Sequence, residues 1–379
     1  MAPKIVVYNK AYVRKTMIGD PVSATIIPRH NAVGAATVVV RANHRAVPHL
    51  LQPGARMVIT DDETNVFLLS GRVVKRSGSG GLDSTMTFEI EDDFAILGHV
   101  LGWVLPANTI DNQGAAGSNW EMTGPAESVL KAAVSQNAVT RLGGMGVNLS
   151  VAADLARGAT ISASLRFHPL FDRLFPVVDG SGLEAAGIGV TVRQQNAGLV
   201  LDVYVPKVYP RPLTEAGGAI AEWSWSNSEP TATRVVVGGQ GAAQLRVFRH
   251  IEDTTREADI GRIIERWRDD SGESDVTRLY LAGQETIDDG AAKSGLSLTL
   301  SQTANFRYGK SLSVGDQATI ELASGVQITD VLKEATLSWS GEDGWKATPK
   351  IGERTDDPDL TFGRVLSRIV RAISNQTRT

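Results

Sequence analysis

Cysteine is missing from this 379-residue sequence. Its absence excludes disulfides, thiolate zinc sites, iron–sulfur clusters and cysteine nucleophiles. The sequence also lacks a run of roughly 18 apolar residues, the length that a membrane-spanning helix needs. A basic flank followed by an apolar core, the pattern of a signal peptide, is absent from residues 1–10. We therefore expect a protein with no membrane partner, made and used in a reducing cytosol or in an assembly built there.

An excess of basic charge is also missing, and aromatic residues are few. The formal net charge is −4 and the pI is near 5.9, whereas a nucleic-acid clamp normally carries a clustered basic excess. Aromatic residues make up 6% of the chain, but its 38 glycines are spread along it. Dispersed glycine predicts many turns between short elements, which is typical of a β-dominated protein.

The length predicts two or three domains rather than one core. Short β-branched and apolar runs bounded by turn residues predict an N-terminal β-barrel domain over residues 1–106. Residues 107–216 predict a middle α/β domain. Renewed alternation predicts a second β-barrel domain over residues 217–352, with a helical insertion at 252–292, and a tail helix follows at 353–379. The expected fold class is mainly β with α/β insertions.

Local patterns predict individual elements of the middle domain. Residues 125–134 predict a helix capped by Thr123, and residues 169–178 predict a second, short helix. Two strands, 188–193 and 199–205, flank the segment Gln-Gln-Asn-Ala-Gly. This arrangement predicts a β-hairpin.

Hydrophobic spacing separates strands from helices in the two expected barrels. Phe88 and Ile90 alternate with polar residues, which predicts a strand with one solvated face. In the insertion, the apolar residues from Ile260 to Trp267 stand at helical spacing and predict one helix. Residues 275–292 predict a second helix.

The tail carries the most regular helical pattern of the sequence. One apolar stripe faces an arginine-containing side, and three arginines are too few to favour membrane or nucleic-acid binding. We expect the stripe to dock on the chain itself or on a neighbouring subunit. It consists of Phe362, Val365, Leu366, Ile369, Val370 and Ile373.

Two segments far apart in the sequence resemble each other. Residues 54–60 and 315–321 share a glycine turn and apolar residues at matching offsets, and each is followed by a similar tetrapeptide, at 72–75 and 330–333. Chance is the alternative explanation, because glycine turns before strands are common. If the repeat is genuine, the chain holds two related barrels. Three such chains can then present a nearly sixfold ring.

No combination of residues predicts a catalytic, metal or cofactor site. The six histidines never form an i, i+4 pair around a glutamate. Acidic clusters at 61–63, 91–93 and 356–357 contain the carboxylates that glycoside hydrolysis uses, but they stand at strand ends and turns, where solvated acids are common. The glycine-rich segment 235–241 lacks a following helix to bind a pyrophosphate, and we interpret it as a hairpin turn.

Four features occur in an order that carries a family resemblance. They are Ile5-Val-Val-Tyr8, residues 51–59 leading to 71–74, the charged stretch 252–261, and residues 308–316 with the closing segment 349–352. In this order the sequence resembles the minor tail proteins that form the baseplate hub of long-tailed (siphovirus) bacteriophages.

The resemblance implies a structural, non-enzymatic protein at the virion's tail tip, with no cofactor. Its expected form is a homotrimer whose two barrels per chain make a pseudo-sixfold ring. That ring would join the tail tube or distal tail protein to the tip and fibres. It would surround a passage for the tape-measure protein and for genome DNA, which passes without sequence-specific binding. The chain ends about 27 residues after the hub pattern, so we expect no appended enzymatic or receptor-binding module.

Two other classes of function stay open. The first is a carbohydrate- or receptor-binding tail-tip protein, for which Trp223 and Trp225 on one strand face are the candidate platform. We interpret these tryptophans rather as a core pair. The second is an embedded hydrolase acting on peptidoglycan through the acidic clusters, with Asp92 as its test residue.

Overall fold

The computed structural model describes residues 3–352 apart from short gaps. The gaps are residues 64, 82–83, 114–118, 176–182, 184–185, 219, 292, 301–307, 323–324 and 326. The predicted tail helix and its apolar stripe therefore lie outside the described residues. Contacts divide the chain into two compact units: residues 1–221 with 299–349, and residues 222–298 with 350–379.

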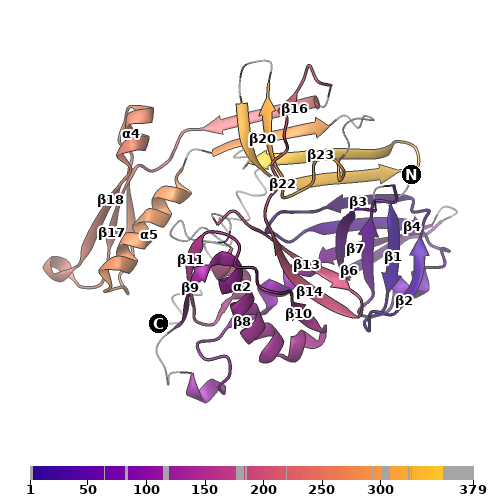
Figure 1. Ribbon diagram of the computed structural model, residues 1–379, viewed down its shortest axis with the longest axis horizontal. Coiled ribbons are helices and arrows are strands. Elements are labelled where there is room, and N and C mark those ends of the chain that lie inside the picture. The colour runs from indigo at the N-terminus through magenta and orange to yellow at the C-terminus, as the bar shows by residue number, and fades with distance from the viewer. Residues whose placement is uncertain are drawn as a thin grey trace. The chain divides into compact units, whose positions relative to one another are not determined.

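A large β-sheet dominates the first unit (Figure 1). Its strands stand in the order β23-β22-β3-β4-β7-β6-β5-β1-β2, and β21 pairs with both β22 and β15. The strands are β1 (Lys4–Tyr8), β2 (Arg14–Ile18), β3 (Ser23–Ile27), β4 (Ala35–Arg41), β5 (Arg56–Thr60), β6 (Phe67–Ser79), β7 (Thr85–Asp92), β15 (Leu213–Thr214), β21 (Gln317–Glu321), β22 (Gln327–Ser340) and β23 (Gly344–Gly352).

Period-two alternation positions these strands. Ile5 and Val7 of β1, and Phe88 and Ile90 of β7, are buried while their neighbours are partly exposed. Each such side chain contributes roughly 1.5–3 kcal/mol by leaving water. The mainly β fold and the solvated face of the strand around Phe88 are confirmed. β2 was not predicted, because it shows two exposed charged residues and little alternation.

Strands from the two ends of the sequence meet in this sheet. β22 lies antiparallel to β3, with Leu337 opposite Ile26, and Figure 1 shows the yellow and indigo strands side by side. One sheet therefore contains strands from both of the segments expected to form barrels. The separation into two barrels and a middle domain stays a prediction.

Between β7 and β15 in the sequence, residues 93–204 fold around a hydrophobic cluster of their own. The helix α2 (Ala126–Val134) contributes Val129, Leu130 and Val134, which are fully buried, as its periodicity predicted. Thr123 is not its cap: it lies in a strand, and its hydroxyl is 2.8 Å from that of Ser162. The short helix near residue 170 is also present, as α3 (Leu170–Leu174).

The predicted hairpin is formed by β13 (Gly189–Gln195) and β14 (Gly198–Tyr204). Asn196 has a φ of 50°, the positive value that a two-residue hairpin turn requires. The remaining elements here are η1 (Asp93–His99), β8 (Leu101–Gly102), η2 (Ile110–Asn112), β9 (Trp120–Pro125), η3 (Ser135–Thr140), η4 (Gly143–Gly146), β10 (Leu149–Val151), β11 (Thr160–Leu165) and β12 (His168–Pro169), with α1 (Val47–Leu50) earlier in the chain.

The second unit contains a three-stranded sheet in the order β18-β17-β19, covered by α5. Its elements are β16 (Ile220–Ser228), β17 (Arg234–Gly238), η5 (Ala243–Leu245), β18 (Phe248–Glu252), α4 (Thr254–Ile260), β19 (Glu265–Asp269), α5 (Val276–Asp289) and β20 (Lys293–Leu300), where β16 pairs with β20. The hairpin turn predicted for residues 235–241 is confirmed by the antiparallel pairing of β17 and β18.

The helix predicted to include Trp267 is wrong. α4 ends where Gly261 adopts a φ of 67°, and Trp267 lies instead on β19, parallel to β17. A glycine in this left-handed conformation is a common helix terminator. The second predicted helix, α5, is confirmed, with Leu279 and Ile287 buried against the sheet. In the part of the chain that the structure describes, no helix is long and apolar enough to cross a membrane.

Candidate functional site

The sequence repeat corresponds to two hairpins of the first unit: β5–β6, here the first hairpin, and β21–β22, the second hairpin. Gly54 and Gly315 precede them with φ of 74° and 92°. In the first hairpin the Val73 amide donates to the Ala55 carbonyl at 2.9 Å. In the second, the Leu332 amide donates to Asp316 at 2.8 Å. Each acceptor directly follows its glycine, so the two hairpins share one hydrogen-bonding arrangement.

This arrangement shifts the predicted alignment by one residue. Arg56 opposes Arg72 in the first hairpin, and Gln317 opposes Val331 in the second. Val73 is therefore the counterpart of Leu332, whereas the tetrapeptide comparison placed it opposite Val331. Both Val73 and Leu332 are buried, which the one-residue correction explains.

The strand β3 pairs with the edge of β22 in the second hairpin. His30 donates its amide to Lys333 O at 2.8 Å, and Ala335 donates to Pro28 O at 3.3 Å. The Arg29 guanidinium lies 2.6 Å from the Glu334 carboxylate beside these bonds. Backbone pairing and one ion pair thus join the first strands of the chain to the second hairpin.

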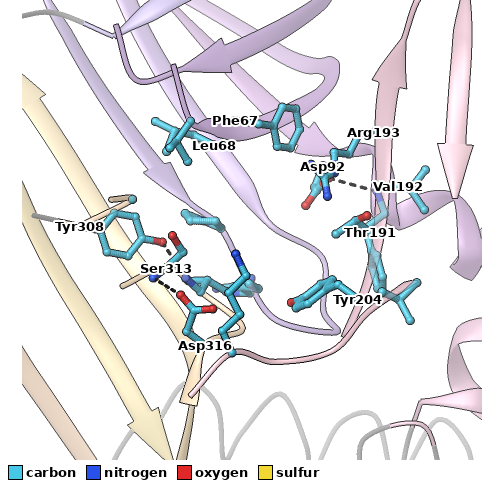
Figure 2. A pocket seen from close by; sticks show the side chains of 18 of the residues that line it. Phe67, Leu68, Asp92, Thr191, Val192, Arg193, Tyr204, Tyr308, Ser313 and Asp316 are labelled. Atoms are coloured by element: carbon cyan, nitrogen blue, oxygen red, sulfur yellow. Dashed lines mark hydrogen bonds between the residues drawn. The ribbon is translucent and has the colours of Figure 1, made fainter. Parts of the chain in front are cut away.

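A cavity of about 440 Å³ lies where three parts of the first unit converge. Figure 2 shows Phe67, Leu68 and Asp92 from the N-terminal strands on one side, and Thr191 to Arg193 with Tyr204 on another. Tyr308, Ser313 and Asp316, which precede the second hairpin, complete the lining. The cavity is therefore a junction between segments that are distant in the sequence.

Hydrogen bonds hold most polar groups of the junction. The Tyr204 hydroxyl is 2.8 Å from His30 Nδ1, and the Val314 amide donates to the Tyr308 hydroxyl at 3.2 Å. The Asp316 carboxylate accepts the Ser313 amide at 2.8 Å. Burial raises the pKa of both tyrosines well above the ordinary value, so both phenols stay protonated at neutral pH.

Asp92 is a carboxyl group of the cavity whose pKa is raised toward neutral pH. Its carboxylate accepts the amides of Phe94 at 3.2 Å and Gly34 at 3.3 Å, and burial raises its pKa to about 7. The 91–93 cluster stands at a strand end, as the sequence indicated, but Asp93 is buried and Asp92 is only partly exposed. Asp93 is buried and bonds Arg56 at 2.6 Å and Ser70 at 2.7 Å.

The other candidate residues do not converge on one site. Asp61 accepts the Glu63 amide in a tight turn, and residues 356–357 lie beyond the described part of the chain. His44 lies 3.2 Å from Asp20, and neither residue is among those that line the cavity. Within the described ranges, no three His, Asp or Glu side chains are grouped so as to hold a metal.

Trp223 does not form a core pair as predicted, because 41% of its surface is exposed on β16. Apart from Asp92, which belongs to the 91–93 acidic cluster, the sequence identified neither the residues of the cavity nor the Arg56–Asp93 pair. Arg56 precedes the alternation of Met57 and Ile59 and is in register with the partly exposed Val58, so the sequence pattern gave no sign of its burial.

Residues 4–353 match the sequence model of a family described as Siphovirus ReqiPepy6 Gp37-like protein. No curated protein matches the sequence. The fold is similar to the 43 kDa tail protein of prophage MuSo2 from Shewanella oneidensis, with a TM-score of 0.58 and 10% identity over 92% of this chain and 98% of that one.

Two further solved structures have a similar fold. The tail protein from Neisseria meningitidis MC58 gives a TM-score of 0.55 at 10% identity, over 93% of this chain and 97% of that one. Prophage tail protein gp18 from Listeria monocytogenes EGD-e gives 0.53 at 10% identity, over 97% and 99%. Because the family model matches nearly the whole sequence, the chain belongs to the Siphovirus ReqiPepy6 Gp37-like family of bacteriophage tail proteins.

Proposed function

We propose that this chain is the baseplate hub at the tip of a siphovirus tail. Three copies form a ring that joins the tail tube or the distal tail protein to the tip and fibre proteins. The ring surrounds the passage taken by the tape-measure protein and the genome, and the protein catalyses no reaction. Membership of a tail-protein family supports a structural role in the virion tail.

The single observation that carries the proposal is the repeated hairpin. Two hairpins with the same glycine turn and the same backbone bond from the following strand give each chain two comparable β modules. Three chains with two such modules each provide six similar positions around one axis. A trimer can then meet a hexameric tube without a mismatch of symmetry.

The mass of the purified chain in solution tests the ring. We expect light scattering at high protein concentration to give three times the chain mass of 40.4 kDa, and electron micrographs to show threefold rings. Antibody labelling of intact virions should mark the tail tip. A chain that stays monomeric at every concentration, in virions whose tips show no threefold ring, would contradict the proposal.

The tail helix is proposed as a contact between subunits. Its expected apolar stripe, from Phe362 to Ile373, would dock on a neighbouring copy or on the chain itself. Removing residues 353–379 should weaken the trimer if the helix docks on a neighbour. If it docks on its own chain, the same deletion should lower thermal stability and leave the trimer intact.

A second candidate function is glycan or receptor binding at the tail tip. The observation that favours it is the exposure of Trp223, since exposed tryptophans are common sugar platforms. A glycan array should then show binding by the natural chain and its loss in Trp223→Ala. The absence of binding by the natural chain would remove this candidate.

A further inference from the structure

The strands β6 and β22 correspond to each other in the two hairpins. The second half of β22 is paired along one edge with another strand, whereas the same edge of β6 is not, among the residues that the structure describes. In the second hairpin, β21 covers the start of β22 and β3 covers its continuation. In the first hairpin, β5 covers residues 67–72 of β6. Within the described ranges, the backbone of residues 74–79 pairs only with β7, on the opposite side. These residues are here called the open edge.

The two strands match closely enough to say which groups the open edge presents. Val74 is an extra residue that bulges out of β6 between Val73 and Lys75. On β22, the Leu332 and Ala335 amides face the same edge three residues apart, so an extra residue stands at the same place. Arg76 is therefore the counterpart of Ala335, whose amide bonds β3. By this correspondence we expect the Arg76 amide to point to the open edge.

The strand that would occupy this edge follows from the order of the strands. β3 and β4 are paired neighbours that precede the first hairpin, and β16 and β20 are paired neighbours that precede the second. The first module is β3, β4 and the first hairpin, and the second is β16, β20 and the second hairpin. In the observed pairing, β3 of the first module lies beside β22 of the second. Replacing each strand by its counterpart in the other module pairs β16 with β6.

Charge supports the exchange. In the observed pairing the acid, Glu334, is on the hairpin strand and the base, Arg29, is on the incoming strand. The counterpart of Glu334 on the open edge is Lys75, and the charged residue within β16 is Glu222. The signs are reversed on both strands, so they remain complementary. Lys75 pairs with Glu89, but 66% of its side chain is exposed, and such a pair is worth little in water.

We propose that the open edge of β6 binds β16 of a second copy of this chain by antiparallel strand pairing. Each chain then supplies one hairpin edge and one incoming strand, a head-to-tail contact that closes into a ring when the rotation per copy is one third of a turn. The inference rests on the proposed trimeric hub and names the strands through which its copies meet. An exposed strand edge is a ready template for such pairing.

Disulfide trapping in the full chain tests the contact, because the natural sequence contains no cysteine. Ser77→Cys is combined with one cysteine on β16, in place of Glu222, Ser224 or Ser228. Opposed residues of paired strands lie close enough for a disulfide at one register only. We expect one of the three double variants to give a ladder that ends at three chains on a denaturing gel and collapses on reduction. Ser77→Cys with Thr277→Cys on α5 is the matched control and should give none.

A proline variant tests the backbone bond itself. Arg76→Pro removes the outward amide, whereas Arg76→Ala removes only the side-chain bonds to the carbonyls of Leu50 and Gln52. We expect Arg76→Pro to raise the concentration needed for trimer formation at least tenfold, and Arg76→Ala to leave it within about twofold. Circular dichroism checks that both variants fold. If Arg76→Pro does not fold, the disulfide trapping alone tests the contact.

The outcomes separate this inference from the ring. If trimers persist in Arg76→Pro and no cysteine pair gives a ladder, the copies meet elsewhere and the inference fails while the hub stands. A chain that never forms trimers overturns the hub proposal and the inference with it.

Discussion

The two hairpins share a backbone arrangement but are anchored differently. At the start of the first hairpin, Arg56 uses its side chain: it makes a buried bond to Asp93 at 2.6 Å and a partly buried bond to Gln194 at 3.1 Å. Its counterpart Gln317 uses its backbone, donating to Lys207 at 2.7 Å and accepting from Tyr209 at 2.8 Å. A repeated unit can thus keep its geometry while side-chain and backbone anchors replace one another.

The largest expected effect comes from giving the first hairpin the anchor residue of the second. Arg56→Gln leaves Asp93 buried without its guanidinium partner, and breaking a buried ion pair in this way costs about 3–5 kcal/mol. Urea unfolding of the chain should show this loss. The control is Arg72→Gln, which replaces the exposed arginine directly opposite and should change stability by less than about 0.5 kcal/mol. Equal effects of the two variants would mean that the buried pair is no anchor.

The two turn glycines provide the next comparison. An added Cβ at Gly315 would lie 2.1 Å from the Tyr204 hydroxyl, while at Gly54 it would lie 2.8 Å from Lys10 Cβ. Both have positive φ, which costs a side-chain-bearing residue roughly 1–2 kcal/mol, and overpacking adds about 1–3 kcal/mol. In thermal unfolding we expect each change to alanine to destabilise by about 2–5 kcal/mol, with the larger loss at Gly315, where the contact is closer. The reverse order would show that the two turns are not packed as described.

The pH dependence of the free energy of unfolding tests the setting of Asp92 in the cavity between the two hairpins. Its pKa is raised to about 7 in the folded chain, whereas an ordinary carboxyl titrates near 3.8. The folded state therefore binds its proton more tightly than the unfolded state, so its contribution to stability is full at low pH and is lost as pH rises toward 7. The slope cannot exceed about 1.4 kcal/mol per pH unit, because one carboxyl differs by at most one bound proton between the two states.

The measurement is the free energy of unfolding between pH 5 and pH 8, compared with Asp92→Asn. Subtracting the two curves removes the titration of other groups. We expect the natural chain to lose stability relative to the variant across this range. Parallel curves would place Asp92 in an ordinary solvated setting.

Sequence patterns predicted elements wherever one short segment carries the whole signal. The alternation at Phe88 and Ile90, the buried face of α2 and the β13–β14 hairpin are examples. The pattern from Ile260 to Trp267 misled because the spacing of apolar residues fits a helix, but Gly261 ends the helix and starts a different element.

The candidate site could not be predicted in the same way. Its cavity is assembled from Asp92, Tyr204 and Tyr308, whose neighbours in sequence carry no common pattern. Asp92 and Asp93 look like surface acids until the chain brings Arg56 and the start of η1 against them. The repeat was visible because both hairpins kept a glycine turn, but only the backbone bonds of Val73 and Leu332 show that the tetrapeptide alignment is displaced by one residue.

The smallest expected effect compares the ion pair beside the second hairpin with the one on the first. Arg29 and Glu334 lie at the contact of β3 with β22, with side-chain exposures of 37% and 18%, whereas Lys75 and Glu89 are 66% and 40% exposed. Double-mutant cycles to alanine should give about 0.5–1 kcal/mol for the first pair and no more than about 0.3 kcal/mol for the second. The difference should shrink in high salt, since screening weakens the partly exposed first pair. A larger coupling for Lys75 and Glu89 in the monomer would tie Lys75 to β7, and would leave it unable to serve as the charged counterpart of Glu334 when a second chain arrives.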